Sequence, residues 1–278
     1  MRRAEAVDRS GRHLGGTVDS WRSAITEADG NRIIIRGHDL VSLIQHRTYA
    51  DVVALLLGGH MPDEGERRLI DAILIAIADH GAGSPSAATA RMAATGNRHA
   101  PEAAVAAGIL AIGDAHAGAG MACMVIIATA LERATRESRS LADVARTTAI
   151  DAHATGHRLP GLGHRMYRED PRTTVLFAMA EQYGKAGQGV AFMRALESAA
   201  AETIKPLPIN VDGAIAAVLH DLGYPAEAAK LIFIVGRTAG LAAHVMEQYT
   251  RERPMRVRIP VVYDGPTAVD MPAEEVKR

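Results

Sequence analysis

The chain has 278 residues, and its 31 basic and 32 acidic side chains give a formal net charge of -1. This balance excludes a global field that would draw the protein to nucleic acid or to a membrane surface. Hydrophobic residues make up 48% but aromatic residues only 4%, so we expect Ala, Leu, Ile and Met to fill a core of closely packed helices.

The single cysteine, Cys123, excludes an internal disulfide and a cysteine metal cluster. It is consistent with a reducing compartment. The polar N-terminus has no apolar stretch typical of a signal peptide, and apolar runs such as 121–130 are shorter than the roughly 20 residues that a bilayer needs. We therefore expect a soluble, cytoplasmic protein without a membrane partner.

Two short β-prone runs, 23–26 and 32–36, flank the turn sequence Ala28-Asp29-Gly30-Asn31 and predict a minor N-terminal β-hairpin. Helical periodicity follows, and the fold class is predicted to be all-α. A run at 121–133 is almost wholly apolar, so we expect it to be buried. The expected helices cover 39–47, 49–57, a segment from 63, 85–95, 102–112, 121–133, 141–155, 171–183, 191–204, 212–222 and 226–250.

The segment 159–172 carries the strongest functional signal. Pro160, Gly161, Leu162 and Gly163 form a tight turn that lets backbone approach a ligand. His164 follows as an acid/base group. The segment also holds three cations suited to phosphates and carboxylates: Arg165, Arg168 and Arg172. Together these residues predict a site for an anionic substrate.

Four further residues are candidates, each with a structural alternative. His80 could simply favour a helix C-terminus, and His116 could sit at a helix–helix corner, although a polar group between apolar helices needs a partner. Either Asp212 or Asn210 could cap the following helix, which leaves the other available. Arg237 lies in an apolar helix and needs an anion, either a substrate carboxylate or an internal acid.

Several familiar motifs are excluded. Gly161-Leu162-Gly163 follows no strand and lacks a third glycine, so it is not a dinucleotide fingerprint. His153 and His157 are four residues apart, but Gly156 intervenes and no third ligand is evident, so we expect no metal.

Taken in order, these segments resemble the citrate synthase superfamily over nearly the whole chain. The resemblance implies a citrate-synthase-like helical fold, with a large domain over 1–116 and 223–278 and a small domain over 117–222 that carries the CoA loop and the catalytic Asp. The segments that carry it are Arg36-Gly37-His38-Asp39, Asp79-His80-Gly81, Ala115-His116-Ala117-Gly118, Gly161-Leu162-Gly163-His164-Arg165, Asp170-Pro171-Arg172, Asn210-Val211-Asp212, Gly236-Arg237-Thr238-Ala239-Gly240 with His244, Arg253-Pro254 and Tyr263-Asp264-Gly265-Pro266.

The resemblance also implies catalytic roles. Asp212 would move the proton at the α-carbon of acetyl-CoA, His116 would stabilise the thioester enolate, and His164 would bond the carbonyl or hydroxyl oxygen of the oxaloacetate half. Enolate and oxyanion both need preorganised donors.

Substrate contacts are implied in the same way. His80, Arg172 and Arg237 would hold the dicarboxylate, and Arg253 would reach it from the other subunit of a homodimer. The turn of Pro160, Gly161, Leu162 and Gly163 would cradle CoA, with Arg165 or Arg168 near its phosphates. A CoA thioester is thus the expected substrate, and no metal is implied.

Two departures from the family pattern refine the expected activity. Only about 20 residues separate Leu55-Leu56-Leu57-Gly58 from His80, a shortening that resembles citryl-CoA lyases and the C-terminal module of ATP-citrate lyase. The family's His-Gly-Gly-Ala is here His116-Ala117-Gly118-Ala119. We expect cleavage of citryl-CoA, or a close analogue, to acetyl-CoA and oxaloacetate. The alternatives are a short citrate or 2-methylcitrate synthase and a non-catalytic CoA- or dicarboxylate-binding subunit.

Overall fold

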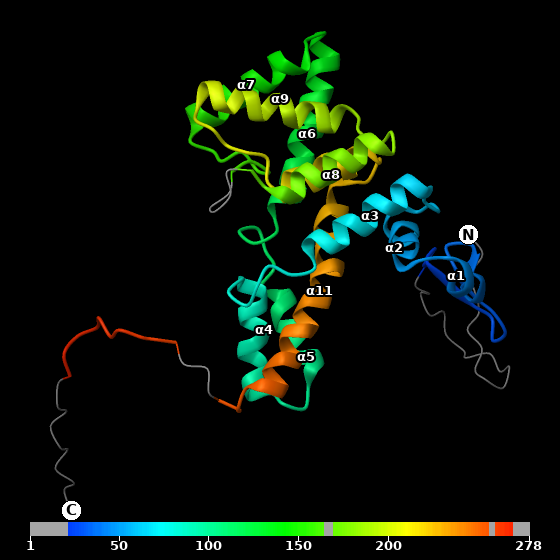
Figure 1. Ribbon diagram of the computed structural model, residues 1–278, viewed down its shortest axis with the longest axis vertical. Helices are drawn as coiled ribbons and strands as arrows, with labels where there is room; N and C mark the ends of the chain where they lie inside the picture. The colour runs from blue at the N-terminus through cyan, green and yellow to red at the C-terminus, as the bar shows by residue number, and fades with distance from the viewer. Residues whose placement is uncertain (1–21, 164–168, 256–258, 269–278) are drawn as a thin grey trace, which may run out of the picture.

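The computed structural model describes residues 22–163, 169–255 and 259–268. It is an elongated helical molecule with a small sheet at one side (Figure 1). The eleven helices of the described part are α1 Leu40–His46, α2 Tyr49–Gly58, α3 Glu64–Ile77, α4 Pro85–Gly96, α5 Pro101–Leu110, α6 Ala119–Glu137, α7 Leu141–Thr155, α8 Pro171–Gln182, α9 Gln188–Thr203, α10 Val211–Asp221 and α11 Ala226–Arg251. The predicted all-α class is confirmed.

The predicted hairpin is present and carries one strand more than expected. Strand β1 (Thr26–Ala28) pairs antiparallel with β2 (Ile33–Ile35), which pairs in turn with β3 (His38–Asp39). Arg36 and Gly37 join β2 to β3 with φ values of 49° and 83°. A two-residue turn with both φ angles positive is the connection that fits the twist of a hairpin.

Most helix starts follow the expected capping chemistry. Asp63 caps α3 through the backbone N–H of Glu66, and Thr48 and Asp51 form a reciprocal capping box at α2. Ser84 precedes Pro85 at the start of α4 as predicted, but its hydroxyl is buried and caps nothing. Side-chain capping therefore fixes some helix starts, whereas Pro at the first position marks α4.

Helix α11 is the central helix of the fold. Its C-terminal half packs against α4 and α5, and it also contacts α3 and α6 (Figure 1). Small side chains allow the α4–α5–α11 contact, because Ala87, Ala90, Ala94 and Ala104 form an apolar cluster with Leu241 and Val245. This is the close Ala-rich packing that the composition predicts.

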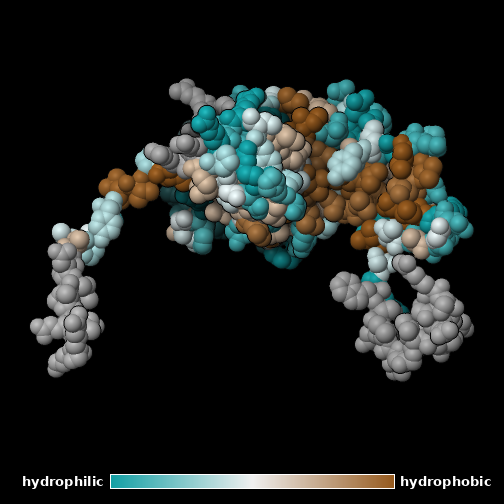
Figure 2. Space-filling view, turned by 90° about the horizontal axis from the view of Figure 1, so that it is seen from below, coloured by the Kyte–Doolittle hydropathy of each residue, from teal (hydrophilic) through white to brown (hydrophobic). Residues whose placement is uncertain are grey.

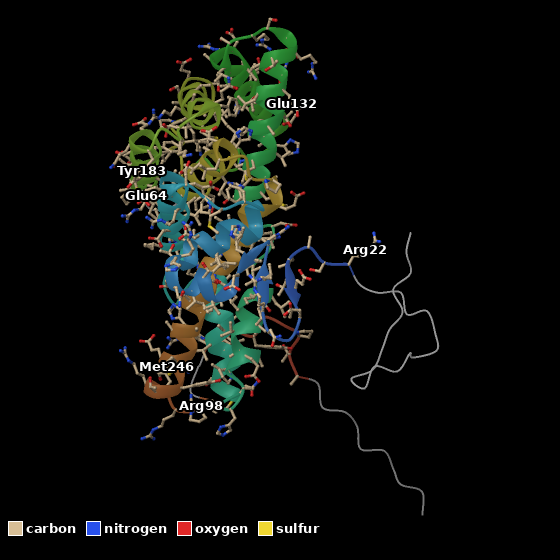
Figure 3. All side chains as sticks on the ribbon, turned by 90° about the vertical axis from the view of Figure 1, so that its right-hand side faces the viewer. Arg22, Glu64, Arg98, Glu132, Tyr183 and Met246 are labelled. Carbon is tan, nitrogen blue, oxygen red and sulfur yellow. The ribbon has the colours of Figure 1, made fainter. Side chains whose placement is uncertain are left out.

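A larger apolar cluster joins α2 and α3 to α6–α10 and the start of α11. Helices α3 and α8 are in contact, and Glu64 at the start of α3 lies close to Tyr183 at the end of α8 in Figure 3. The two-part division of the chain at residues 116 and 223 stays a prediction. The expectation that 121–133 is buried all round is wrong, because Val125 is 51% exposed while Met124 and Ile127 on the other face are buried.

Exposed apolar side chains gather along the extended segment 259–268. Ile259, Val261, Val262 and Tyr263 all lie in the solvent, on the arm that projects from the body in Figure 2. Among the described residues, α11 alone is long and apolar enough to cross a membrane by length and composition. Core helices meet the same criterion, and α11 packs against six other helices, namely α2, α3, α4, α5, α6 and α10.

Candidate active site

The start of α10 presents Asp212. Asn210 is the N-cap residue, and its Oδ1 accepts the N–H of Gly213 at 3.1 Å. Its Nδ2 donates to the carbonyl oxygen of Gly163 at 2.9 Å. Because Asn210 takes the capping role, the Asp212 carboxylate is left for other interactions. The choice that the sequence left open is thus resolved by the hydrogen bonds.

The turn of residues 160–163 is seated directly against this helix start. Gly161 has a φ of 84°, and a Cβ on it would lie 2.7 Å from both Cys123 Sγ and Gly213 Cα. The N–H of Asn210 donates to the Gly161 carbonyl oxygen at 3.0 Å. Two glycines therefore face each other because neither position has room for a side chain. Gly161 fixes the distance between the turn and α10.

Arg172 is held by a buried carboxylate at the start of α8. Asp170 caps this helix and receives a bidentate contact from Arg172, with Nε–Oδ1 at 3.0 Å and Nη2–Oδ2 at 2.8 Å. Its Oδ2 also accepts the N–H of Val211 at 3.1 Å. Burial opposes ionisation of Asp170, but the bonds from Arg172 outweigh it and keep its pKa lowered. Asp170 thereby links the α8 and α10 helix starts.

His116 lies in the connection between α5 and α6. Its Nε2 is 3.0 Å from the buried Ser86 Oγ, and its ring meets the Phe233 ring edge to face, with centroids 6.3 Å apart. Burial lowers the pKa of His116, and the nearby Arg237 charge lowers it further. The imidazole is therefore neutral near pH 7. When Ser86 donates to Nε2, the ring proton resides on Nδ1.

Arg237 is buried in the middle of α11. Its Nε donates to the Ile77 carbonyl oxygen at 2.8 Å, and its guanidinium lies 4.8 Å from the centroid of the Phe233 ring. Its Nη1 is buried without a hydrogen-bond partner among the described residues. A guanidinium held on one edge with an unsatisfied donor on the other is prepared for an incoming anion.

These side chains converge on one cavity of about 150 Å³, which we call the catalytic cavity. It is lined by His80, His116, Ala117, Arg172, Asp212 and Arg237, together with Ile77, Asn210, Val211 and Phe233. Burial raises the pKa of Asp212, although the charges of Arg172 and Arg237 partly oppose the shift. A carboxyl group that keeps its proton to higher pH can act as an acid as well as a base.

A second, larger pocket of about 620 Å³ lies beside the turn of residues 160–163, and we call it the turn pocket. Its lining includes His153, His157, Arg158, Leu162, Gly163 and Lys205. Arg158 and Lys205 are exposed at its rim. An open pocket with apolar walls and two cations fits a ligand that carries both a flat apolar group and anionic groups.

Several predicted site residues lie elsewhere. Arg253 is exposed, and α11 ends at Arg251, 14 residues after Arg237, about 21 Å along the axis at 1.5 Å per residue. It therefore does not reach the catalytic cavity of its own chain. His164, Arg165 and Arg168 lie outside the described residues.

Three contributors were not predicted: Asp170, Ser86 and Phe233. Asp170 was within a recognised segment, but its partners come from α8 and α10, and only the fold reveals them. Ser86 and Phe233 carry no local signal for contact with His116. Cys123 lies under the turn, and burial raises the pKa of its thiol to about 12, so it is no nucleophile.

Among the described residues, no group of three or more His, Cys, Asp or Glu side chains is arranged to hold a metal ion. The catalytic cavity instead combines a carboxyl group of raised pKa, a neutral imidazole and two guanidinium groups. This set defines a site for acid–base chemistry on an anionic substrate.

The family described as citrate synthase, C-terminal domain, matches residues 60–258, and the chain belongs to this family. It is 30% identical over 228 residues to the citrate synthase of Haloferax volcanii, a match that covers 80% of this chain and 57% of the relative. The chain thus spans a little over half the length of that relative.

Solved structures share the fold. The citryl-CoA lyase of Hydrogenobacter thermophilus superposes with a TM-score of 0.82 at 35% identity, over 91% of this chain and 97% of that one. The ATP citrate lyase of Methanothrix soehngenii, solved with citrate and coenzyme A, gives a TM-score of 0.70 at 19% identity, over 94% of this chain and 43% of that one. At 19% identity, the second match shows a shared fold and no more.

Proposed function

We propose that this protein is an enzyme of the citryl-CoA lyase type, which cleaves citryl-CoA to acetyl-CoA and oxaloacetate. The observation that carries the proposal is the convergence of Asp212, His116, Arg172 and Arg237 on one small cavity. Its support from relatives is the likeness to the Hydrogenobacter citryl-CoA lyase over nearly the full length of that chain.

Arg172 and Arg237 bind the dicarboxylate part of the substrate. Arg172 is oriented by Asp170, and Arg237 has a buried Nη1 that no protein group satisfies in the described part. Carboxylates accept from guanidinium groups in a planar, bidentate geometry, which fixes the reacting carbon relative to Asp212 and His116. His80, at the rim of the same cavity, contributes a third contact.

Cleavage breaks the bond between the hydroxyl-bearing carbon of citryl-CoA and the α-carbon of its thioester. His164 takes the hydroxyl proton, the carbonyl of oxaloacetate forms, and the bonding electrons pass into the thioester as an enolate. His116 donates from Nδ1 to the enolate oxygen, because Ser86 engages Nε2. Asp212 then delivers a proton to the α-carbon, a step that its raised pKa favours.

The CoA part of the substrate occupies the turn pocket. Leu162 and Gly163 line it on the side of the turn, and Arg158 and Lys205 supply positive charge for phosphate groups. The Asn210–Gly163 hydrogen bond connects this pocket to the start of α10, which carries Asp212. Binding of the nucleotide part thereby positions the thioester at the catalytic residues.

A second candidate is a short citrate or 2-methylcitrate synthase, favoured by the names of the sequence relatives. The same residues would run the condensation, followed by thioester hydrolysis. Two assays separate the candidates. A lyase releases oxaloacetate from citryl-CoA, detected by a coupled reduction to malate. A synthase releases free CoA from acetyl-CoA and oxaloacetate at a comparable rate. If neither assay shows turnover, the remaining candidate is a non-catalytic CoA- or dicarboxylate-binding subunit.

We also propose a homodimer in which Arg253 of each chain completes the catalytic cavity of the other. The support is the distance of about 21 Å between Arg237 and the end of α11, together with the exposure of Arg253. Co-expressed Asp212→Asn and Arg253→Ala chains are then expected to recover activity that neither variant has alone. A fully active monomer by light scattering would rule out this arrangement.

A further inference from the structure

Ala117 has a backbone conformation that is unfavourable for its residue type. Its φ is 70°, in the left-handed region that glycine adopts without strain. Three other described non-glycine residues have positive φ: Arg36 in the hairpin turn, Ser138 at the end of α6 and Met255 beyond α11. Ala117 also lies in a turn, directly before Gly118, the N-cap residue of α6, but it is the one of these four residues that lines the catalytic cavity. Backbone strain at a functional site suggests a role for the side chain.

The surroundings place Ala117 beside the reacting atoms. It directly follows His116, and both line the cavity with Asp212. Its methyl group packs against the larger apolar cluster. One turn further, a Cβ on Gly120 would be 4.0 Å from the Asp212 backbone oxygen, so the start of α6 lies against the start of α10. Ala117 therefore belongs to the same cavity wall as His116 and Asp212.

The cavity is small enough for one methyl group to matter. Its volume is about 150 Å³, and it must hold the dicarboxylate and the thioester carbonyl of the substrate. Binding of a larger acyl chain would require space near the α-carbon, which lies between His116 and Asp212 in the proposed mechanism. Glycine at position 117 would supply that space and relieve the strain, so the alanine removes volume at a cost in stability.

We propose that the Ala117 methyl group is a specificity determinant that restricts the thioester to an acetyl unit and excludes an α-methyl substituent. This inference rests on the proposed function and narrows its substrate class. The Ala117 methyl group would thus select citryl-CoA over its 2-methyl analogue. Pockets discriminate a single methylene by about 10- to 200-fold, which sets the expected scale.

The test is a competition between two thioesters. Wild type, Ala117→Gly and Ala115→Gly each receive equimolar acetyl-CoA and propionyl-CoA with excess oxaloacetate, and mass spectrometry quantifies the two condensation products, as thioester or free acid. At initial rates, before the reverse reaction contributes, the product ratio equals the ratio of kcat/KM values. Ala115 is a matched control because it is exposed, two residues away and outside the cavity lining.

We expect wild type and Ala115→Gly to favour acetyl-CoA by at least about 10-fold, and Ala117→Gly to lower that ratio by about 10-fold. The melting temperature of Ala117→Gly should be equal to or above that of wild type, which shows that the variant folds. An unchanged ratio in active Ala117→Gly, or a wild type that uses both thioesters equally, overturns the inference alone. Wild type without turnover of either thioester or of citryl-CoA overturns the proposed function as well.

Discussion

The catalytic cavity and the turn pocket both border the contact between the turn and α10, but they differ in volume and in the exposure of their charged groups. The cavity measures about 150 Å³ and is walled by buried charged groups such as Arg237. The turn pocket measures about 620 Å³ and carries its cations, Arg158 and Lys205, in the solvent. The two arginines of the cavity have hydrogen-bond partners within the protein, whereas the cations of the turn pocket are long, exposed side chains.

The contrast separates chemistry from binding. Charges interact strongly in a buried site, where water does not screen them, and weakly at an exposed rim. Groups that stabilise a transition state gain most from burial, whereas a cofactor-sized ligand is held by many moderate contacts. Substitutions in the cavity should therefore change kcat, and substitutions in the turn pocket should change KM.

The largest effect is expected for Asp212→Asn. The amide neither delivers nor accepts the α-carbon proton, so kcat should fall about 10³-fold. The raised pKa of Asp212 indicates that burial disfavours its charged form, so the variant should unfold at the same temperature as wild type or higher. Citryl-CoA cleavage and thermal unfolding measured together check both statements. A loss of less than tenfold in kcat would remove Asp212 from the mechanism.

Arg237→Lys should lower kcat/KM about 100-fold. Lysine retains the charge but cannot donate to the Ile77 carbonyl oxygen, lie on the Phe233 ring and bind a carboxylate in a plane at once. Steady-state kinetics with citryl-CoA measure the loss. The exposed Arg194, whose guanidinium lies over Phe177, offers a control, because Arg194→Lys removes a similar stacked pair outside the cavity. Equal losses in both variants would contradict the assignment.

The pH dependence should be the same in the two directions of the reaction. Cleavage needs protonated Asp212, so its kcat/KM should fall about tenfold per pH unit as pH rises above the raised pKa of that group. The reaction takes up and releases no net proton, so kcat/KM for condensation should fall in parallel. The lowered pKa of His116 keeps its imidazole neutral near pH 7 and above. Profiles of kcat/KM that slope in opposite directions would contradict this assignment.

Lys205→Ala in the turn pocket should give the smallest effect. One exposed cation–phosphate contact contributes about 1 kcal/mol, so KM for the CoA thioester should rise about fivefold, and kcat should change less. The increase should shrink at high salt, because ions screen exposed charges. Lys185→Ala serves as the control, since Lys185 pairs with Asp63 outside the pocket. A fold-decrease in kcat larger than the fold-increase in KM would contradict the assignment of the turn pocket to binding alone.

Local features of the fold could be predicted from sequence because local chemistry determines them. Asp63 and Thr48 carry short polar side chains at helix starts, and Gly30 has the positive φ that a turn requires. Strand β3 could not be predicted, because a two-residue strand has no periodicity. The exposure of Val125 could not be predicted either, because an apolar helical sequence does not show whether the outer face of the helix is covered.

The site was predicted as a set of residues but not as a geometry. His80, His116, Arg172, Asp212 and Arg237 do line one cavity. The arrangement depends on contacts between distant segments. The Gly161–Gly213 approach and the Ser86–His116 contact each join positions whose partners no local pattern identifies. The left-handed conformation of Ala117 could not be predicted either, because alanine rarely adopts a positive φ.

The buried carboxylate of Asp170 has a consequence for the order in which the protein is made. One of its oxygens needs the N–H of Val211, which the ribosome adds about 40 residues later. Until then the Asp170 carboxylate has only its hydrogen bonds from Arg172. The contact between the starts of α8 and α10 therefore forms late in synthesis, when α10 is available to dock. A nascent chain that ends between these two positions also lacks Asp212 and Arg237, so its catalytic cavity is incomplete.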